Sequence, residues 1–235
     1  MADRPTFEAL PVRTYEFGDP RVKSLELRED PTGQWAGGVG STVWDAGLVL
    51  AKYIERLFGA GPVPLDTTFA STAKTREFRL PEGASVLELG SGTGLVGLVY
   101  ARLSAGTTTR VRLTDKQLSM PLLQQNISAN NVSNAECSML DWEDTPNGQT
   151  YDIILLSDCL WHPPLYDSLI ATLQTIAGSN TVILLAYEKR NFQAELEFWR
   201  KFSTRFSFTY VTEAELDDTW QSEDIFVFRA WPKGT

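Results

Sequence analysis

A glycine-rich segment at residues 86–94 is the part of this sequence whose residue types and spacing point most directly to chemistry. It reads VLELGSGTG, so an apolar stretch runs straight into glycines at positions 90, 92 and 94. Such spacing lets the backbone turn sharply and approach a ligand closely, and the free N–H groups that open the next helix face an anionic group. The segment therefore predicts a binding turn for a nucleotide-type cofactor.

The spacing of these glycines fits two kinds of cofactor site. Gly90, Gly92 and Gly94 make G-x-G-x-G, whereas the last two together with Gly97 satisfy the G-x-G-x-x-G of dinucleotide binders. Asp115 ends a predicted strand about 20 residues after the turn, where an acid that binds a ribose is expected. A tight turn without a ligand is the structural alternative to both.

Alternating strand and helix patterns surround the glycine turn and must position it. The predicted strands are 85–89, 109–114, 135–139, 151–156 and 180–187, and the predicted helices are 94–104, 117–130 and 164–177. Strands that are apolar throughout, such as 153–156, indicate a parallel sheet covered on both faces. Two aromatic strands at 206–211 and 225–231 are typical of a terminal antiparallel pair. The sequence thus predicts an α/β fold with a Rossmann-like sheet of seven strands.

A small extension at 1–40 is expected to precede the domain, which we place at 41–235. The alternating segment 22–29 predicts an exposed strand that caps an edge of the sheet. A glycine loop follows, and then a helix with an apolar face that begins with Trp44. Because Trp44 lies beside the loop, it is the residue of that face best placed to reach a ligand.

The composition of the 235 residues, 43% of them apolar, is that of one soluble globular domain. A net charge of −9 argues against a nucleic-acid partner or an anionic membrane surface, and it fits either a basic partner or solubility alone. Cys137 and Cys159 are the only cysteines and lack zinc-ligand spacing, so we predict no metal site and a reducing compartment. With no apolar leader or membrane-length run, we expect a cytoplasmic or nuclear monomer.

Taken together, these segments resemble the seven-strand S-adenosylmethionine-dependent methyltransferases. The likeness is to the group called methyltransferase-like family 16, which contains non-histone protein lysine methyltransferases and fungal members described as nicotinamide N-methyltransferase-like. It extends from about residue 38 to the C-terminus. The matching segments are VWDA at 43–46, ELGSGTGLVG at 88–97, LTD at 113–115, Asn126, LDW at 140–142, SD at 157–158 and VILLA at 182–186.

The resemblance implies S-adenosylmethionine as the cofactor and gives roles to residues at strand ends and helix starts. Two glycines of the turn border the methionine part, Asp115 binds both ribose hydroxyls, and Trp142 offers the adenine a stacking face. Trp44 closes over the cofactor, and Ser157 lies where the fourth strand ends. The full set of implied cofactor-binding residues is Trp44, Glu88, Gly90, Gly92, Asp115, Asp141, Trp142 and Ser157.

One departure from the family pattern lies after the fourth strand, where the acceptor is expected. Lysine methyltransferases of this group carry Asp-x-x-Tyr or Asp-x-x-Phe there, whereas this chain has Asp158 followed by Trp161. A carboxylate holds and orients an amine, and aromatic walls lower the pKa of that amine by desolvation. We therefore predict Asp158 and Trp161 as acceptor-orienting catalytic residues. The acceptor is expected to be a lysine or amino group of a basic protein, with a small amine or pyridine as the alternative.

Two other function classes remain open on the sequence alone. A nicotinamide-dependent oxidoreductase could use Gly92, Gly94 and Gly97, but the chain has no Tyr-x-x-x-Lys pair to carry the proton. A cofactor-binding scaffold without turnover is the third class. His162, the only histidine, is predicted to be a loop or packing residue.

Overall fold

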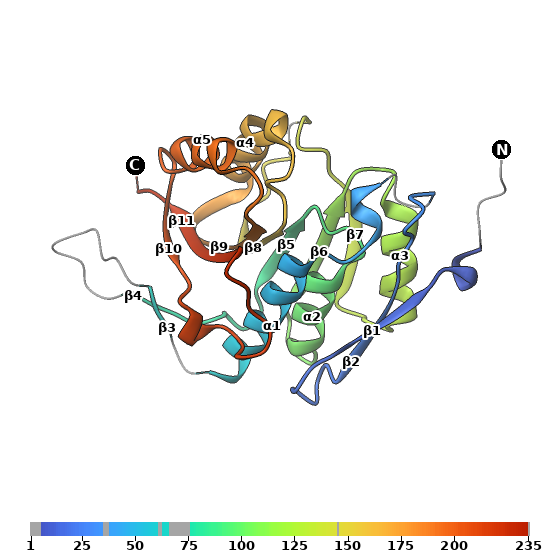
Figure 1. Ribbon diagram of the computed structural model, residues 1–235. Helices are drawn as coiled ribbons and strands as arrows, with labels where there is room; N and C mark the ends of the chain where they lie inside the picture. Colours follow the sequence, from blue (N-terminus) through green and yellow to red (C-terminus); the bar gives the residue numbers. More distant parts are fainter. Residues whose placement is uncertain (1–5, 35–37, 61–62, 66–75, 145, 235) are drawn as a thin grey trace.

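Seven strands form one sheet in the computed structural model, which describes residues 6–34, 38–60, 63–65, 76–144 and 146–234 (Figure 1). Their order across the sheet is β10-β11-β9-β8-β5-β6-β7. Strands β5 to β9 run parallel, and β11 pairs antiparallel with both β9 and β10. The predicted seven-stranded α/β sheet with a terminal antiparallel pair is confirmed. The strands are β5 Ser85–Leu89, β6 Arg110–Asp115, β7 Ala135–Met139, β8 Tyr151–Ser157, β9 Ala177–Glu188, β10 Phe206–Tyr210 and β11 Ile225–Pro232.

The central strands are apolar on both faces because helices cover both. In β8, Ile153 and Leu155 join the core beneath one set of helices, and Ile154 and Leu156 join the core beneath the other. All four are at most 1% exposed. One face is covered by α1 Asp45–Gly59, α2 Leu95–Leu103 and α3 Met120–Ala129, and the other by α4 Tyr166–Ile176 and α5 Phe192–Phe202.

The N-terminal segment forms a sheet of its own. Strand β1 Val12–Glu16 pairs antiparallel with β2 Ser24–Arg28, and β2 packs on α2 and α3. Alternation makes one side of β2 apolar, and Leu25 and Leu27 are fully buried there. The strand expected at 22–29 is present, but it lies over these helices rather than along an edge of the large sheet. The division of the chain at residue 40 remains a prediction.

Shorter elements complete the described chain. A second small sheet pairs β3 Val63–Leu65 with β4 Arg76–Phe78. Single 3-10 turns are η1 Phe7–Ala9, η2 Val39–Ser41, η3 Pro163–Leu165 and η4 Glu213–Glu215. Within the described residues, no helix has both the length and the apolarity needed to span a membrane.

Candidate active site

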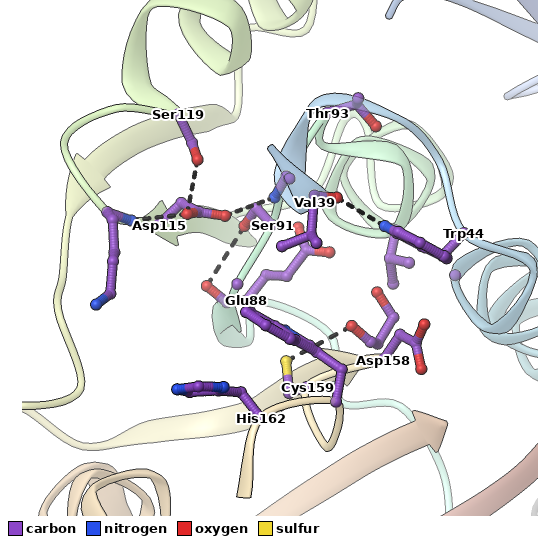
Figure 2. Close-up of a pocket in the computed structure, with 18 of the residues that line it drawn as sticks. Val39, Trp44, Glu88, Ser91, Thr93, Asp115, Ser119, Asp158, Cys159 and His162 are labelled. Carbon is purple, nitrogen blue, oxygen red and sulfur yellow. Dashed lines mark hydrogen bonds between the residues drawn. The ribbon is translucent and has the colours of Figure 1, made fainter. Parts of the chain in front are cut away.

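A cavity of about 700 Å³ opens where the parallel strands end, the edge at which such sheets hold ligands (Figure 2). Its walls come from the turn after β5, the ends of β6 and β8, the segment after β7 and the residues that lead into α1. Of the ten predicted site residues, nine line this cavity: Trp44, Glu88, Gly90, Gly92, Asp115, Trp142, Ser157, Asp158 and Trp161. A single concave site therefore unites both predicted groups, except for Asp141.

The glycine turn has a backbone that side chains would disrupt. Gly90 and Gly92 have φ of +63° and +53°, in the left-handed region that favours glycine. A Cβ on Gly92 would lie 3.0 Å from the carbonyl oxygen of Gly40, and one on Gly90 would lie 3.1 Å from Cys159 Sγ and 3.3 Å from the Trp142 ring. The chain thus approaches its protein neighbours closely at both positions, and the close approach to a ligand remains a prediction.

Asp115 ends β6 and ties its end to the glycine turn. Its Oδ2 accepts a hydrogen bond from the Gly92 N–H at 2.8 Å, and its Oδ1 accepts from Ser119 Oγ at 2.8 Å and from the Lys116 N–H at 2.7 Å. Burial raises the pKa of this carboxyl, and the same hydrogen bonds oppose that rise. Ser119 was missed in the sequence, where a lone serine before a helix gives no motif.

Glu88 forms part of the cavity floor and is only 1% exposed. Its Oε2 accepts a hydrogen bond from the Gly97 N–H in the first turn of α2, at 3.1 Å. Burial raises the pKa of Glu88 to about 8, with the nearby Asp115 charge adding to the rise. The carboxyl is therefore mostly protonated at neutral pH in the protein without ligand.

Asp141 is the one predicted site residue that the structure does not bring into the cavity wall. Its Oδ1 accepts from the Glu143 N–H at 3.2 Å within its own turn, and its Oδ2 pairs with Lys116 Nζ at 3.1 Å. Both partners, Lys116 and Glu143, line the cavity themselves, so Asp141 lies behind them rather than in its wall. The neighbouring residues Leu140, Trp142 and Glu143 line the cavity instead.

Trp44 caps the start of α1 and stands at the mouth of the cavity, 42% exposed. Its ring nitrogen donates to the carbonyl of Val39 at 2.7 Å, which fixes the ring to the turn at 39–41 (Figure 2). Gly40 of the same turn lies beside Gly92. The guanidinium of Arg190 lies 5.3 Å from the centre of the same ring. This distance suits a cation–π contact.

Asp158 lies one residue past β8 and forms an ion pair with an arginine that the sequence analysis did not identify. Arg190 donates to both of its carboxylate oxygens, at 2.6 and 2.7 Å, and also to Glu188 Oε2 at 2.7 Å. The Asp158 side chain is 6% exposed and that of Arg190 is 35% exposed. The hydrogen bonds to Asp158 raise the pKa of Arg190. Trp161 lines the cavity and is 46% exposed, with its ring centre 4.9 Å from that of His162.

The family of this chain follows from its sequence as a whole. Residues 22–205 match the family described as lysine methyltransferase. The chain belongs to that family. The family confirms the predicted methyltransferase activity and S-adenosylmethionine as the cofactor, and an oxidoreductase is set aside.

Relatives of this lysine methyltransferase cover most of its length. It is 29% identical to protein N-lysine methyltransferase METTL21A of Mus musculus, over 94% of this chain and 87% of the mouse protein. It is 31% identical to METTL21A of Danio rerio, over 82% and 78% of the two chains. It is 29% identical to protein-lysine N-methyltransferase EFM6 of Saccharomyces cerevisiae, over 91% and 88%.

Solved structures share the fold of this lysine methyltransferase. The crystal structure of a fibrillarin/Nop5p complex matches with a TM-score of 0.55 at 11% identity, over 94% of this chain and 97% of that chain. The CurJ carbon methyltransferase matches with a TM-score of 0.51 at 20% identity, over 66% and 50%.

The cavity of this lysine methyltransferase has the features that S-adenosylmethionine requires. Its volume falls within the roughly 300–1,000 Å³ of small-molecule sites. Gly90 and Gly92 line it without side chains, at positions where a Cβ would be crowded by neighbouring atoms at 3.0–3.1 Å. Asp115 has about four acceptor sites, and three of them already receive hydrogen bonds, so two ribose hydroxyls would take the remaining site and replace one donor, such as the rotatable Ser119 hydroxyl. The residues present therefore fit the cofactor.

Proposed function

We propose that this enzyme methylates a lysine side chain of a protein, with the cofactor in the Asp115 half of the cavity and the lysine entering through the Trp161 half. The observation that carries the proposal is that one continuous cavity joins the glycine turn to Asp158 and Trp161. Relatives named as protein lysine methyltransferases support a protein acceptor.

The cofactor half uses groups at the ends of β5, β6 and β7. We assign the ribose hydroxyls to Asp115, whose oxygens already accept hydrogen bonds from Gly92 and Ser119 in the site. The Trp142 ring, 3.3 Å from where a Gly90 Cβ would lie, gives the adenine a stacking face. Trp44 closes the mouth above, while Glu88 and Ser157 form polar parts of the wall.

When bound, S-adenosylmethionine would supply a methyl group on a sulfonium. A neutral lysine amine in line with that methyl carbon would form the C–N bond as the C–S bond breaks, and S-adenosylhomocysteine would be the leaving group. The protein must therefore align the lysine nitrogen and favour its unprotonated form. Trp44 and Trp161 shield that nitrogen from water, and desolvation lowers the pKa of an amine. The lysine would lose its proton to solvent before its nitrogen passes between these two rings.

The Arg190 contact changes how Asp158 acts. A free carboxylate would stabilise the lysine ammonium and oppose its deprotonation. Here both carboxylate oxygens of Asp158 accept from Arg190, so its negative charge is already balanced. We assign Asp158 and Arg190 to positioning the acceptor wall, and Trp161 to contact with the lysine side chain.

Substitution of Trp161 tests the acceptor half. Trp161→Ala should lower transfer of labelled methyl groups to the proteins of a cell extract at least tenfold, about 1.4 kcal/mol of barrier. Affinity for S-adenosylmethionine, measured by calorimetry, should remain nearly unchanged. Trp220→Ala is the matched control, because Trp220 is 43% exposed and does not line the cavity. Loss of cofactor binding with unchanged turnover per bound cofactor would move Trp161 into the cofactor half.

A further inference from the structure

Exposed apolar side chains gather on α5 and the terminal strands, outside the cavity. Phe192 and Leu196 on α5 are 65% and 42% exposed, and Tyr210 on β10 is 39% exposed. Phe226 and Phe228 on β11 are half-buried. We call these five residues the aromatic surface. Figure 1 shows α5 and the two strands on the same side of the molecule.

The core does not need the exposed residues of α5. This helix packs through Phe198 and Phe202, both fully buried, and through Trp199. Phe192 and Leu196 are one turn apart, so they lie on the same face of α5. This face is next to the face that carries Phe198 and Phe202. Large apolar side chains gathered in one exposed area mark interaction sites more often than isolated ones do.

Ring contacts join the strand residues of the aromatic surface to one another and to Trp199 of α5. Trp199 lies 4.4 Å from Phe228 between ring centres and so joins the helix to the strands. Tyr210 lies 5.7 Å from Phe228 and 6.0 Å from Phe226. These distances are those of packed aromatic pairs.

The aromatic surface adjoins the cavity through two consecutive residues. Lys189 Nζ lies 5.8 Å from the centre of the Phe226 ring, and Arg190 lines the cavity. A lysine side chain reaches roughly 6 Å from its Cα, and each residue beside it adds at most about 3.6 Å of extended chain. Residues near a target lysine must therefore lie close to the mouth, within reach of this surface.

We propose that the aromatic surface docks the protein substrate through an apolar patch near its target lysine, a patch with basic residues beside it. The aromatic surface adjoins the cavity that receives the target lysine. A protein whose lysine enters the cavity therefore also reaches this surface, which indicates the substrate as the occupant. The net charge of −9 favours a basic partner. This inference rests on the proposed function.

A double variant in the exposed residues tests the proposal. Phe192→Ser with Leu196→Ser removes two exposed side chains and leaves the core residues in place. The probe is labelled S-adenosylmethionine with increasing amounts of cell extract, and the rate is read on the most strongly labelled protein. The apparent KM for that protein should rise at least tenfold, with cofactor affinity and the rate at saturation unchanged. Val12→Ser is the control, a 47% exposed apolar residue on β1.

The outcomes separate this inference from the proposed function. Labelling by the double variant that equals labelling by Val12→Ser overturns the docking surface alone. A wild-type dimer that the double variant dissociates, seen by sedimentation, also overturns it, because the surface then pairs two copies of this chain. A wild-type enzyme that binds the cofactor but labels no protein lysine overturns the proposed function and the docking surface with it.

Discussion

Gly92 should resist replacement within the cofactor turn, and comparison with Gly106 separates the steric reason from the backbone reason. Both glycines have positive φ, +53° and +85°, so alanine costs either site about 1–2 kcal/mol of backbone strain. A Cβ on Gly106 meets nothing within 4 Å, whereas one on Gly92 meets the Gly40 carbonyl oxygen at 3.0 Å. Only Gly92→Ala therefore adds a steric term.

The size of that steric term follows from what surrounds Gly40. To admit the new methyl group, Gly40 must withdraw by a few tenths of an ångström, and it also borders Ser119 Oγ and Asp115 Oδ2. Overpacking of this kind costs typically 1–3 kcal/mol. Because the displaced groups surround the cofactor half, we expect Gly92→Ala to weaken binding of S-adenosylmethionine by about 2 kcal/mol, roughly 30-fold in Kd.

Calorimetry with S-adenosylmethionine measures the effect directly, and unfolding in urea measures the strain that both variants share. Gly106→Ala should lose stability but keep the wild-type Kd. Equal cofactor affinities for the Gly92 and Gly106 variants would refute the reasoning. The glycine at position 92 would then be needed only for its positive φ, and not for the space beside Gly40.

Three further predictions follow from the contacts in the cavity. Asp115→Ala should weaken cofactor binding by roughly 1.5–3 kcal/mol in calorimetry, the scale of hydrogen bonds to a charged group, and unchanged affinity in a folded variant would contradict its role. Glu88 has a pKa near 4.5 in the unfolded chain and about 8 in the folded protein, so the folded protein binds its proton more tightly. The free energy of unfolding of the wild type, relative to Glu88→Gln, should therefore fall as the pH rises from 4.5 to 8 and then level off. A difference in urea unfolding that does not change with pH would contradict this. Arg190→Met should lower the free energy of unfolding, measured in urea, by about 2 kcal/mol. This is about half of what the loss of one partner costs in a fully buried ion pair, because Arg190 is partly exposed. Adding Asp158→Asn should recover much of that loss, and no recovery would argue against the pairing.

The turn and its fold could be predicted because their signals are local. Residues 86–94 carry the end of a strand, the glycines and the start of a helix in nine consecutive positions, and Asp115 ends the next strand. Apolar strands such as 153–156 identify a sheet covered on both faces without reference to partners.

The remaining features depend on contacts between distant segments. Arg190 pairs with Asp158 across 32 residues, and no motif connects them. The pairing of Asp141 with Lys116 depends on how two neighbouring strand ends face each other. For β2, alternation predicts a strand with one buried side but cannot tell an edge of the large sheet from the surface of two helices.

The central claim is that one cavity transfers a methyl group from S-adenosylmethionine to a protein lysine. The most direct measurement incubates the enzyme with labelled cofactor and a cell extract and identifies the modified residue by mass spectrometry, with Asp115→Ala in parallel. We predict methyl-lysine in a protein with the wild type, and strongly reduced labelling with Asp115→Ala at limiting cofactor. A methyl group found only on small molecules, or undiminished labelling by Asp115→Ala under those conditions, would contradict the account.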